Sequence, residues 1–508
     1  MRLTVFLCST LVMSLIGILP ASVAAQESDS TAPFMAPDSP DEHFEKLSNA
    51  LDEQAKQIEE LKAQLADMKK DSQLKTRTES KGCGIDSVFK QVPVIAEKEQ
   101  DTDCGSEADT KPLQLRFLAE YNKGFQISPV DPKADPFQIK VNGWTQFRHV
   151  GFSRDVDSWT DNAGVTRQVR SRNNFDIERA RLVFSGYAVD PRSTFFIQLD
   201  GDTDGREAVD FFDFWWAWKF SDALRVQIGK RKVSASRRWL LGARDSRFAD
   251  RPLATDFFRP DRTTGIWATG KLGDDLHYEL TLGNGYRTAN RNAAEIDDQL
   301  IYSATSWWDA NGPFGKTLTD HAVSEDFLVR VGHSFNYAPN TSDTFGTPLR
   351  ETGFLRLSDG TVLTNPNALG AGSQVSEFDS LFYAVDVGTK YQGWSFSSEF
   401  YFRWLRNIQG TGPISTDSLY QYGYFLEGGQ AIIPNILDWN VRYSRVSGDF
   451  GSANEYSAGI NWYPLDSTKW KITFDVSKFD GSPLNNTASE ILAGDDGTLF
   501  RTQFQAEF

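Results

Sequence analysis

The sequence predicts an all-β protein: an antiparallel transmembrane β-barrel of about 16 strands, preceded by a short N-terminal coiled-coil helix. Three observations support this fold class. The last residues form an alternating strand that ends on an aromatic residue, Phe508. The first residues have the pattern of a secretion signal, and strands with rows of aromatic side chains recur from Phe137 onward.

The C-terminal segment alternates between two kinds of side chain. Successive side chains of a strand point to opposite faces, which gives this strand an apolar and a polar face. The apolar face holds Phe500, Thr502, Phe504, Ala506 and Phe508; the polar face holds Arg501, Gln503, Gln505 and Glu507. Such a strand with a terminal aromatic is typical of transmembrane barrels, and a half-buried strand of a soluble sheet is the alternative.

Residues 1–25 have the pattern of a secretory signal peptide. Arg2 precedes a mainly apolar run from Leu3 to Ile18, and small residues follow up to Ala25, after which we expect cleavage. The alternative, a membrane anchor, needs an apolar span of about 20 residues. After Ala25 no run is apolar enough to cross a membrane as a helix. A closed barrel is the other structure that satisfies every backbone group in lipid.

Residues 26–40 are rich in Ser, Pro, Asp and Ala and predict a linker. Residues 41–72 then carry a heptad seam that predicts a coiled-coil oligomerisation helix. The seam runs through Phe44, Leu47, Leu51, Gln54, Ile58, Leu61, Leu65 and Met68. The alternative is an amphipathic helix that packs on its own chain. We expect an oligomeric stalk in the periplasm, with Gln54 fixing its register.

Residues 73–136 predict a periplasmic linker that contains two cysteines. Cys83 and Cys104 lie in a Gly- and Asp-rich stretch. An oxidising compartment favours a disulfide between them over two free thiols. The third cysteine, Cys8, lies in the signal, and no C-x-x-C pair or nearby histidine indicates a metal.

The barrel domain is expected over residues 137–508, where period-two segments recur. Rows of large aromatic residues opposite polar ones are typical of a lipid-facing wall with interfacial girdles. One row holds Phe212, Phe214, Trp216, Trp218 and Phe220, and another holds Trp394, Phe396, Phe400, Phe402 and Trp404. The composition, 13% aromatic but only 40% hydrophobic, fits strands that face water on one side.

The connections alternate between short turns and long polar loops. The long ones lie near 149–171, 233–262, 285–325, 406–418 and 479–498, as expected for short periplasmic turns and long external loops. Counted from either end of the domain, the strands near 326–337 and 381–391 both run toward the periplasm, so an upward strand must separate them. The best candidate, 351–358, brings the count to 16, which is wide enough for an aqueous channel.

A basic segment between Arg225 and Arg262 stands out in a chain of net charge −16. If the long loop after the fifth strand folds inward, its side chains form a positive constriction that holds anions by charge-assisted hydrogen bonds. We predict this anion-binding role for Arg231, Lys232, Arg237, Arg238, Arg244 and Arg247. The alternative is that these side chains contact lipopolysaccharide phosphates or neighbouring loops outside the barrel.

Because alternate residues of a strand point to the same face, the positions opposite the apolar rows are expected to line the pore. Several cations occupy such positions. They are Lys140, Arg179, Arg181, Arg225, Arg330 and Arg442. Parity also places acids such as Asp213, Glu279, Glu399 and Asp475 on the inner face, so the predicted wall is mixed.

The sequence argues against several other classes of protein. The net charge of −16 disfavours a nucleic-acid partner. No Walker loop, H-E-x-x-H or G-x-S-x-G motif is present, so we predict no enzyme, no catalytic residues and no cofactor. The run from Asp200 to Gly205 resembles the start of a calcium loop. Its twelfth position, however, is Phe211 rather than an acid, and we expect no metal site.

The strand wall around the basic loop resembles a known family, the phosphate-selective porins O and P. The resemblance covers roughly Phe137 to Phe508 and is strongest over residues 176–285. It rests on Phe195–Asp200 through Asp213 and Trp215, on Ile228–Val233, and on Arg259–Gly265 at the start of the next strand. It implies a trimeric outer-membrane channel with a basic constriction, and the loop here carries arginines with few lysines.

These patterns together predict a water-filled channel in a bacterial outer membrane, with its N-terminal segment in the periplasm. We expect it to prefer anions, with phosphate or other small anions as solutes, and to contact outer-membrane lipid. Two alternatives stay open: a general or carbohydrate porin without anion preference, and a structural protein whose coiled coil contacts the cell wall.

Overall fold

The computed structural model describes residues 116–202, 209–289, 295–342, 355–465 and 467–508. The chain divides into two compact units, Met1–Asp109 and Thr110–Phe508, and all described residues belong to the second. The predicted signal peptide, the linker 26–40, the coiled coil 41–72 and the Cys83–Cys104 disulfide therefore lie outside the described residues. No helix in the described ranges is long and apolar enough to span a membrane.

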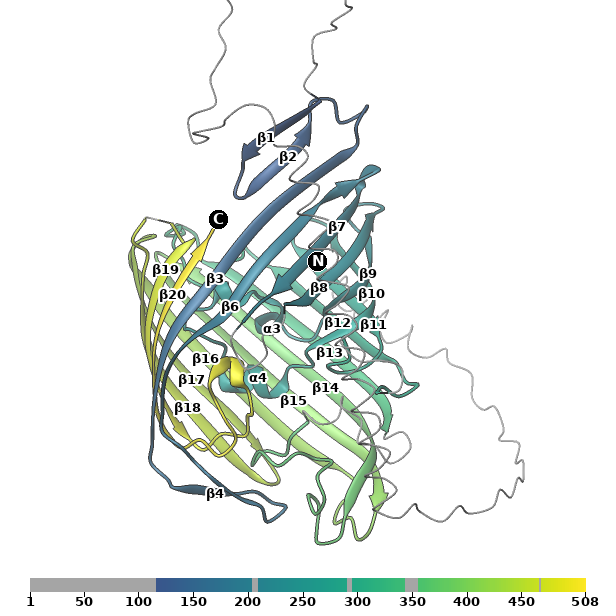
Figure 1. The fold of residues 1–508 in the computed structure, drawn as a ribbon, viewed down its shortest axis with the longest axis vertical. Coiled ribbons are helices and arrows are strands. Elements are labelled where there is room, and N and C mark those ends of the chain that lie inside the picture. The colour runs from purple at the N-terminus through teal and green to yellow at the C-terminus, as the bar shows by residue number, and fades with distance from the viewer. Residues whose placement is uncertain (1–115, 203–208, 290–294, 343–354, 466) are drawn as a thin grey trace, which may run out of the picture. The chain divides into compact units, whose positions relative to one another are not determined.

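Sixteen antiparallel strands close into one barrel, which confirms the predicted fold class (Figure 1). Each strand pairs with the next along the chain, and the last pairs with the first, from Gly497 opposite Arg154 to Glu507 opposite Trp144. Closure leaves no free sheet edge in the wall. The strands are β3 (Phe137–Arg154), β6 (Arg172–Ala188), β7 (Asp190–Asp200), β8 (Asp210–Lys219), β9 (Arg225–Lys232), β10 (Arg262–Leu272), β11 (Leu276–Gly283), β12 (Ile301–Asp309), β13 (Leu328–Ser342), β14 (Gln374–Tyr391), β15 (Trp394–Thr411), β16 (Leu419–Ile433), β17 (Leu437–Gly448), β18 (Gly451–Trp462), β19 (Trp470–Asp480) and β20 (Gly497–Glu507).

Two small hairpins lie beside this wall. β1 (Phe117–Tyr121) pairs with β2 (Phe125–Pro129), and Phe125–Ile127 of β2 continue the pairing onto β3. The sequence analysis placed no strand before Phe137. A second hairpin, β4 (Ser158–Thr160) with β5 (Thr166–Gln168), forms part of the connection between β3 and β6.

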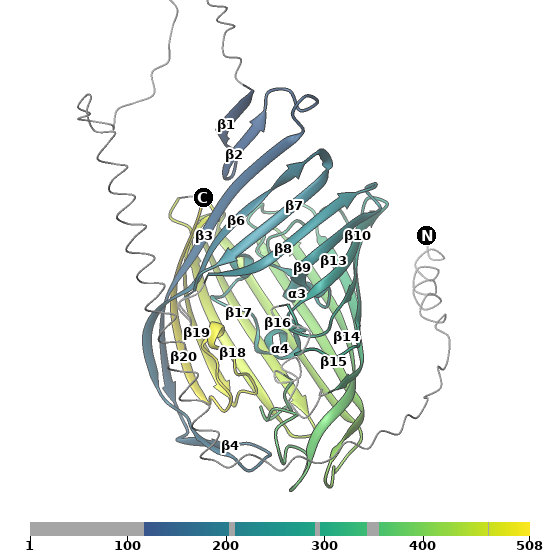
Figure 2. The same cartoon turned by 45° about the vertical axis from the view of Figure 1, so that its right-hand side comes forward.

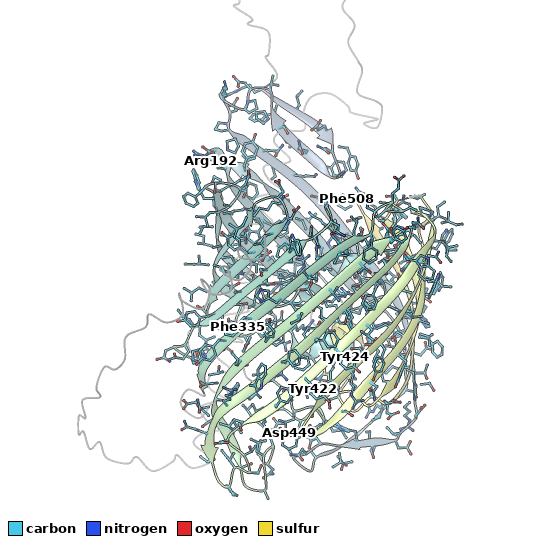
Figure 3. All side chains as sticks on the ribbon, turned by 180° about the vertical axis from the view of Figure 1, so that it is seen from behind. Arg192, Phe335, Tyr422, Tyr424, Asp449 and Phe508 are labelled. Carbon is cyan, nitrogen blue, oxygen red and sulfur yellow. The ribbon has the colours of Figure 1, made fainter. Side chains whose placement is uncertain are left out.

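The two faces of the wall differ as the alternation predicts. The exposed outer face carries large apolar side chains, among them Phe400, Phe474 and Phe500, and Figure 3 shows Phe335, Tyr422 and Tyr424 on this face. The inner face carries buried polar and charged side chains, such as Arg148, Glu427 and Arg501. An apolar exterior around a polar interior is the pattern of a barrel surrounded by lipid.

The connections lie at two ends of the barrel, here named the turn end and the loop end. The turn end is the one where β20 finishes, and its connections are mostly short, such as 220–224, 273–275 and 392–393. The loop end holds long connections, such as 155–171, 233–261 and 481–496. Two connections break this rule: residues 449–450 are short at the loop end, and residues 310–327 are long at the turn end.

The strand count of 16 is confirmed, but two segments were assigned wrongly. The predicted loop 285–325 contains the whole of β12, Ile301–Asp309. β13 therefore runs from the turn end to the loop end, opposite to the predicted direction. The predicted strand 351–358 is no barrel strand in its described part, where Arg356 forms a single bridge with Val362.

The outer aromatic row predicted for β8 is also wrong at one position. The register between β7 and β8 shifts after Gln198, which pairs with Asp213, while Leu199 pairs with Phe211. Phe212 is the extra residue of this bulge. Its ring lies under the guanidinium groups of Arg181 and Arg262, at 4.0 Å and 3.5 Å from the ring centroid, and so faces the lumen.

Candidate functional site

The long connection between β9 and β10 folds into the barrel, as the sequence analysis predicts. It contains the short helices α3 (Arg237–Leu240) and α4 (Leu253–Phe258), with one 3-10 turn, η1 (Ala243–Asp245), between them. Figures 1 and 2 show both helices inside the ring of strands. We name residues 233–261 the inner loop.

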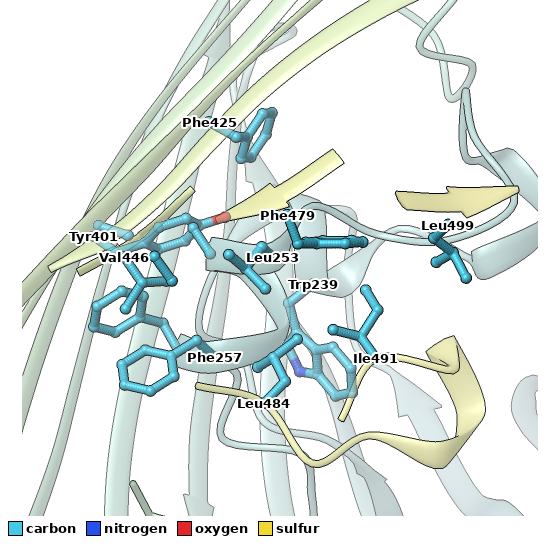
Figure 4. Packing of buried hydrophobic residues seen from close by; sticks show 14 of the residues in the cluster. Trp239, Leu253, Phe257, Tyr401, Phe425, Val446, Phe479, Leu484, Ile491 and Leu499 are labelled. Carbon is cyan, nitrogen blue, oxygen red and sulfur yellow. The ribbon is translucent and has the colours of Figure 1, made fainter. Parts of the chain in front are cut away.

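Apolar packing explains why the inner loop enters the lumen. Trp239, Leu253 and Phe257 of the loop are buried in one cluster with inner-face side chains of the wall (Figure 4). The wall contributes Tyr401, Phe425, Val446, Phe479 and Leu499. Phe258 stacks on Tyr401 with ring centroids 5.4 Å apart. The hydrophobic effect therefore holds the loop against β15–β20.

Backbone groups of the inner loop are satisfied by carboxylates of the wall. The backbone N–H groups of Ala249 and Leu253 donate to Asp475 at 2.8 Å and to Glu455 at 2.7 Å. The N–H of Arg238 donates to Glu399 at 2.5 Å. A buried loop needs such partners because an unpaired buried N–H is costly. The wall thus supplies the acceptors that a surface loop takes from water.

Asp250 is the main charged anchor of the inner loop. Its carboxylate lies 3.3 Å from Arg148 and 3.1 Å from Arg179, and both arginines also contact Glu178. Its backbone oxygen accepts a hydrogen bond from Arg442 at 2.9 Å. Burial alone would raise the pKa of Asp250, but Arg179 and Arg148 outweigh burial and hold this pKa below its usual range. Asp250 therefore stays ionised.

Three of the six predicted constriction residues lie partly exposed on the side toward β8–β13. Arg231 pairs with Glu279 at 2.8 Å, and Lys232 donates to the carbonyl oxygen of Trp239 at 2.7 Å. Arg237 lies over the ring of Trp307, at 4.1 Å from its centroid.

The other three serve as anchors or lie at the rim. Arg238 and Arg247 are each 1% exposed. Arg238 lies 3.6 Å from Glu427, and Arg247 donates to Ser395 at 2.9 Å. Arg244 is more exposed and pairs with Glu507 at 2.8 Å at the turn end. The structure thus does not bring all six together at one constriction.

The six predicted pore-lining cations also divide into groups. Arg179 and Arg442 are buried in ion pairs with the loop and the wall. Arg181 and Arg330 are paired at 2.8 Å and 2.5 Å with Asp200 and Asp309. Arg225 contacts Thr194 at 2.8 Å and lies over the ring of Trp215. Lys140 is half-buried on β3, opposite Ser185.

The sequence analysis missed the aromatic rings of the inner face. Cations lie over the inner rings of Phe212, Trp215, Trp239, Trp267, Trp307 and Phe314. Parity alone would have identified Trp215, which lies between the outward Phe214 and Trp216. An expectation of large aromatic residues only against lipid does not include rings that face the lumen.

Several lumen cations are held by neutral acceptors rather than carboxylates. Lys471 donates to the backbone oxygens of Arg244 and Ser246, and Arg403 donates to Gln421 at 2.6 Å. Lys232 and Arg247 likewise bond to carbonyl, hydroxyl or amide oxygens. Within the described ranges none of these four forms an ion pair with a carboxylate. The guanidinium charges of Arg247 and Arg403, which have no carboxylate in these ranges to balance them, therefore add to the positive potential of the lumen.

No protein-family model matches this chain, and no curated protein sequence matches it. Solved structures do match. An anion-selective porin from Comamonas acidovorans is 11% identical with a TM-score of 0.48, over 73% of this chain and 99% of that one. The trimer form of OmpT, an outer membrane protein of Vibrio cholerae, is 9% identical with a TM-score of 0.47, over 73% and 99%. The outer membrane channel DcaP of Acinetobacter baumannii is 9% identical with a TM-score of 0.44, over 73% and 98%.

Proposed function

We propose that this protein is an outer-membrane porin that forms a water-filled passive diffusion channel with a preference for small anions. The inner loop carries the proposal, because it narrows a closed barrel and brings Arg237 and Arg247, which contact an aromatic ring and neutral acceptors, into the lumen. A ring of fixed positive charge lowers the barrier for anions and raises it for cations.

We assign the selectivity to partly exposed arginines on the side of the lumen toward β8–β13. Arg225, Arg231 and Arg237 have these properties, and each lies over an inner tryptophan ring. Planar guanidinium groups suit phosphate and carboxylate through paired hydrogen bonds. Phosphate is thus the first solute to test.

The remaining parts of the proposal follow from the fold class and the N-terminal sequence. The apolar outer wall contacts outer-membrane lipid, three copies assemble into a homotrimer, and the segment before the barrel lies in the periplasm. The predicted coiled coil supports the trimer and can reach the cell wall.

Reversal potentials in planar bilayers under a salt gradient test the proposal. We expect an anion preference for the wild type and a weaker one for the triple variant Arg225→Gln/Arg231→Gln/Arg237→Gln. Arg445→Gln is the matched control, because Arg445 bonds to Asn454 outside the lumen. A clear cation preference of the wild type would contradict the proposed anion selectivity. Phosphate added to chloride solutions should reduce the single-channel current of the wild type more than that of the triple variant.

Two alternative functions are distinguished by the same recordings together with a test of envelope integrity. The first alternative is a carbohydrate porin, which would bind neutral sugars in its lumen. Sugar block without anion preference would favour that class. For the structural tether, deletion of residues 41–71 should weaken the envelope and leave conductance unchanged.

A further inference from the structure

A second basic site lies at the loop end, apart from the inner loop. Three connections enclose a cavity of about 390 Å³: the β3–β6 connection with its hairpin, residues 355–373, and residues 481–496. Its lining includes Trp159, four arginines and three side-chain amides. The arginines are Arg167, Arg170, Arg172 and Arg356, and the amides are Gln168, Asn365 and Asn485. We name it the loop-end pocket.

Hydrogen bonds between the three connections hold the pocket in shape. The backbone N–H of Asn162 donates at 2.8 Å to both Asp359 and Thr361, and its side-chain amide donates to the carbonyl oxygen of Ala368 at 2.7 Å. Arg172 forms a two-pronged contact with Asp495, at 3.0 Å and 2.7 Å. Each connection is thus tied to a neighbour, and the cavity is preformed.

The pocket has more positive than negative charge. Two of its arginines are neutralised, because Arg167 pairs with Asp161 at 2.5 Å and Arg172 pairs with Asp495. In the described part of the chain, Arg170 and Arg356 have no carboxylate partner. The four arginines face only these two aspartates in the lining, which leaves a surplus of two charges.

Arg356 lies where its positive charge is disfavoured. Its guanidinium donates to the carbonyl oxygen of Gly360 at 2.5 Å, a neutral acceptor. Burial, together with the nearby charges of Arg167 and Arg287, lowers the pKa of Arg356 to about 10, although Asp359 and Asp161 act in the opposite direction. A bound anion would offset both burial and repulsion by stabilising the charged guanidinium.

Trp159 gives the pocket an apolar wall. The backbone of Gly494 and Gly360 lies against its ring, and a Cβ at Gly494 would overlap the indole. Both glycines have positive φ, +84° and +102°, which other residues rarely adopt. The ring is therefore fixed by two positions that favour glycine, and the guanidinium of Arg167 lies 5.5 Å from its centroid.

We propose that the loop-end pocket binds a sugar phosphate, with the phosphate at Arg170 and Arg356 and the sugar ring against Trp159. The volume of about 390 Å³ is far larger than the roughly 30 Å³ that one water molecule occupies, so a bare inorganic anion would leave most of it empty. Small-molecule sites combine an apolar wall with a few placed polar groups. Asn365 and Asn485 supply donors and acceptors for hydroxyl groups.

Calorimetric titration of the full-length, detergent-solubilised protein tests this site. Glucose 6-phosphate should bind at least about tenfold more tightly than glucose or inorganic phosphate, a difference of about 1.4 kcal/mol. Equal affinities for the three probes, or no binding of glucose 6-phosphate, would overturn the proposal. The same sugar phosphate chemistry occurs in lipopolysaccharide headgroups. Stronger binding of purified lipopolysaccharide than of glucose 6-phosphate would overturn the assignment to a soluble solute.

Variants test which residues bind the phosphate and which bind the sugar ring. Arg170→Gln/Arg356→Gln should weaken glucose 6-phosphate binding at least about tenfold. Trp159→Phe should preserve the binding and Trp159→Leu should weaken it. Lys478→Gln is the matched control, because Lys478 is a cation at the loop end that pairs with Asp155 outside the pocket. Heat-dependent gel mobility verifies that each barrel is folded. Binding that survives the double arginine variant in a folded barrel would contradict the proposal.

The proposal for the loop-end pocket and the proposal for the channel can be tested separately. The double arginine variant leaves the inner loop intact, so its anion preference in bilayers should equal that of the wild type. Loss of that preference would mean that the pocket arginines act on permeation rather than on a separate ligand.

Discussion

At the scale of single residues, the charged centre of the lumen depends on Asp250. Its carboxylate contacts both Arg148 and Arg179, which also contact Glu178, and all four groups are buried. In Asp250→Asn, the guanidinium groups of Arg148 and Arg179 lose the carboxylate that they share on the inner loop. Removal of one partner from a buried ion pair costs about 3 kcal/mol, so the free energy of unfolding should fall by roughly this amount.

The test is urea unfolding of the folded barrel, followed by gel mobility. Asp222→Asn is the control, because Asp222 lies in the turn 220–224 and pairs with Lys219 in solvent. The control should change the unfolding midpoint little. Equal midpoints for Asp250→Asn and the wild type would mean that Asp250 does not anchor the inner loop. Larger current fluctuations of Asp250→Asn in bilayers should accompany the loss of the anchor.

A second residue-scale prediction concerns pH and the turn-end connection 310–327. The ring of His321 accepts a hydrogen bond from the N–H of Asn435 at 3.2 Å and lies 3.5 Å from Asp438. Burial lowers the pKa of His321 and outweighs the opposing effect of Asp438. Because the native state binds fewer protons than the unfolded state, this contribution to stability is complete above about pH 6.5 and declines as the pH falls toward the lowered value.

Limited proteolysis of the connection 310–327 between pH 7.5 and pH 5 measures this effect. The wild type should become more sensitive as the pH falls below about 6.5. His321→Gln, which cannot be protonated, should show a smaller change over the same range. His149→Gln is the control, since His149 lies on β3 and bonds to Asn173 away from this connection. An identical pH response of His321→Gln and wild type would contradict the prediction.

At the scale of elements, the sequence identified the barrel but not every strand. β12 was missed because its outer face carries Ala304 and Ser306 between Tyr302 and Trp308, so the apolar alternation is interrupted. Segment 351–358 alternates for another reason. Leu355 and Leu357 are buried in a cluster of the loop end with Leu363. Alternation reports one buried face, and it does not say whether lipid or a loop covers that face.

The candidate site was predictable to a similar extent. The density of arginines between Arg225 and Arg262 located the inner loop correctly, and the buried cluster gives the reason for its direction. The role of each arginine was not predictable, because it depends on partners far away in sequence. Arg238 is an anchor because Glu399 and Glu427 lie behind it, while its neighbour Arg237 faces Trp307.

The element-scale prediction is that the inner loop sets both conductance and selectivity. Lys232 and Arg262 are paired across β9 and β10, so about four Gly and Ser residues can replace residues 236–259 as a hairpin connection. Conductance should rise severalfold, because the inner loop no longer occupies the lumen and the open cross-section is larger. Anion preference should fall and turn toward cations, since Glu399, Glu455 and Asp475 lose the loop N–H groups that they now accept.

Planar-bilayer recordings measure both quantities in one experiment. Replacement of the β4–β5 hairpin by a short Gly-Ser linker is the control, because this hairpin lies in the loop-end connection 155–171. The control should leave conductance and reversal potential unchanged. An unchanged conductance after replacement of the inner loop would show that the loop does not limit the channel.

At the scale of the whole molecule, the position of the inner loop depends on closure of the barrel. The inner loop takes hydrogen-bond partners from β15, β18 and β19, and its anchor Asp250 takes partners from β3 and β6. The seam between β20 and β3 therefore lies within the set of strands that hold the loop. Weakening the seam should loosen the constriction as well as the barrel.

Gly143 and Phe508 test this coupling at the seam. The backbone N–H of Phe508 donates to Gly143 at 2.9 Å, and a Cβ at Gly143 would overlap the Phe508 ring. Gly143→Ala should displace the ring and lower the free energy of unfolding by about 1 kcal/mol through overpacking. Gly151→Ala on the same strand is the matched control, because its Cβ would meet no atom within 4 Å. For Gly143→Ala alone, we expect the folded barrel to convert to the unfolded gel band at a lower temperature. We also expect larger current fluctuations of this variant in bilayers. Equal behaviour of the two variants would mean that the contact of Phe508 with β3 does not contribute to closure.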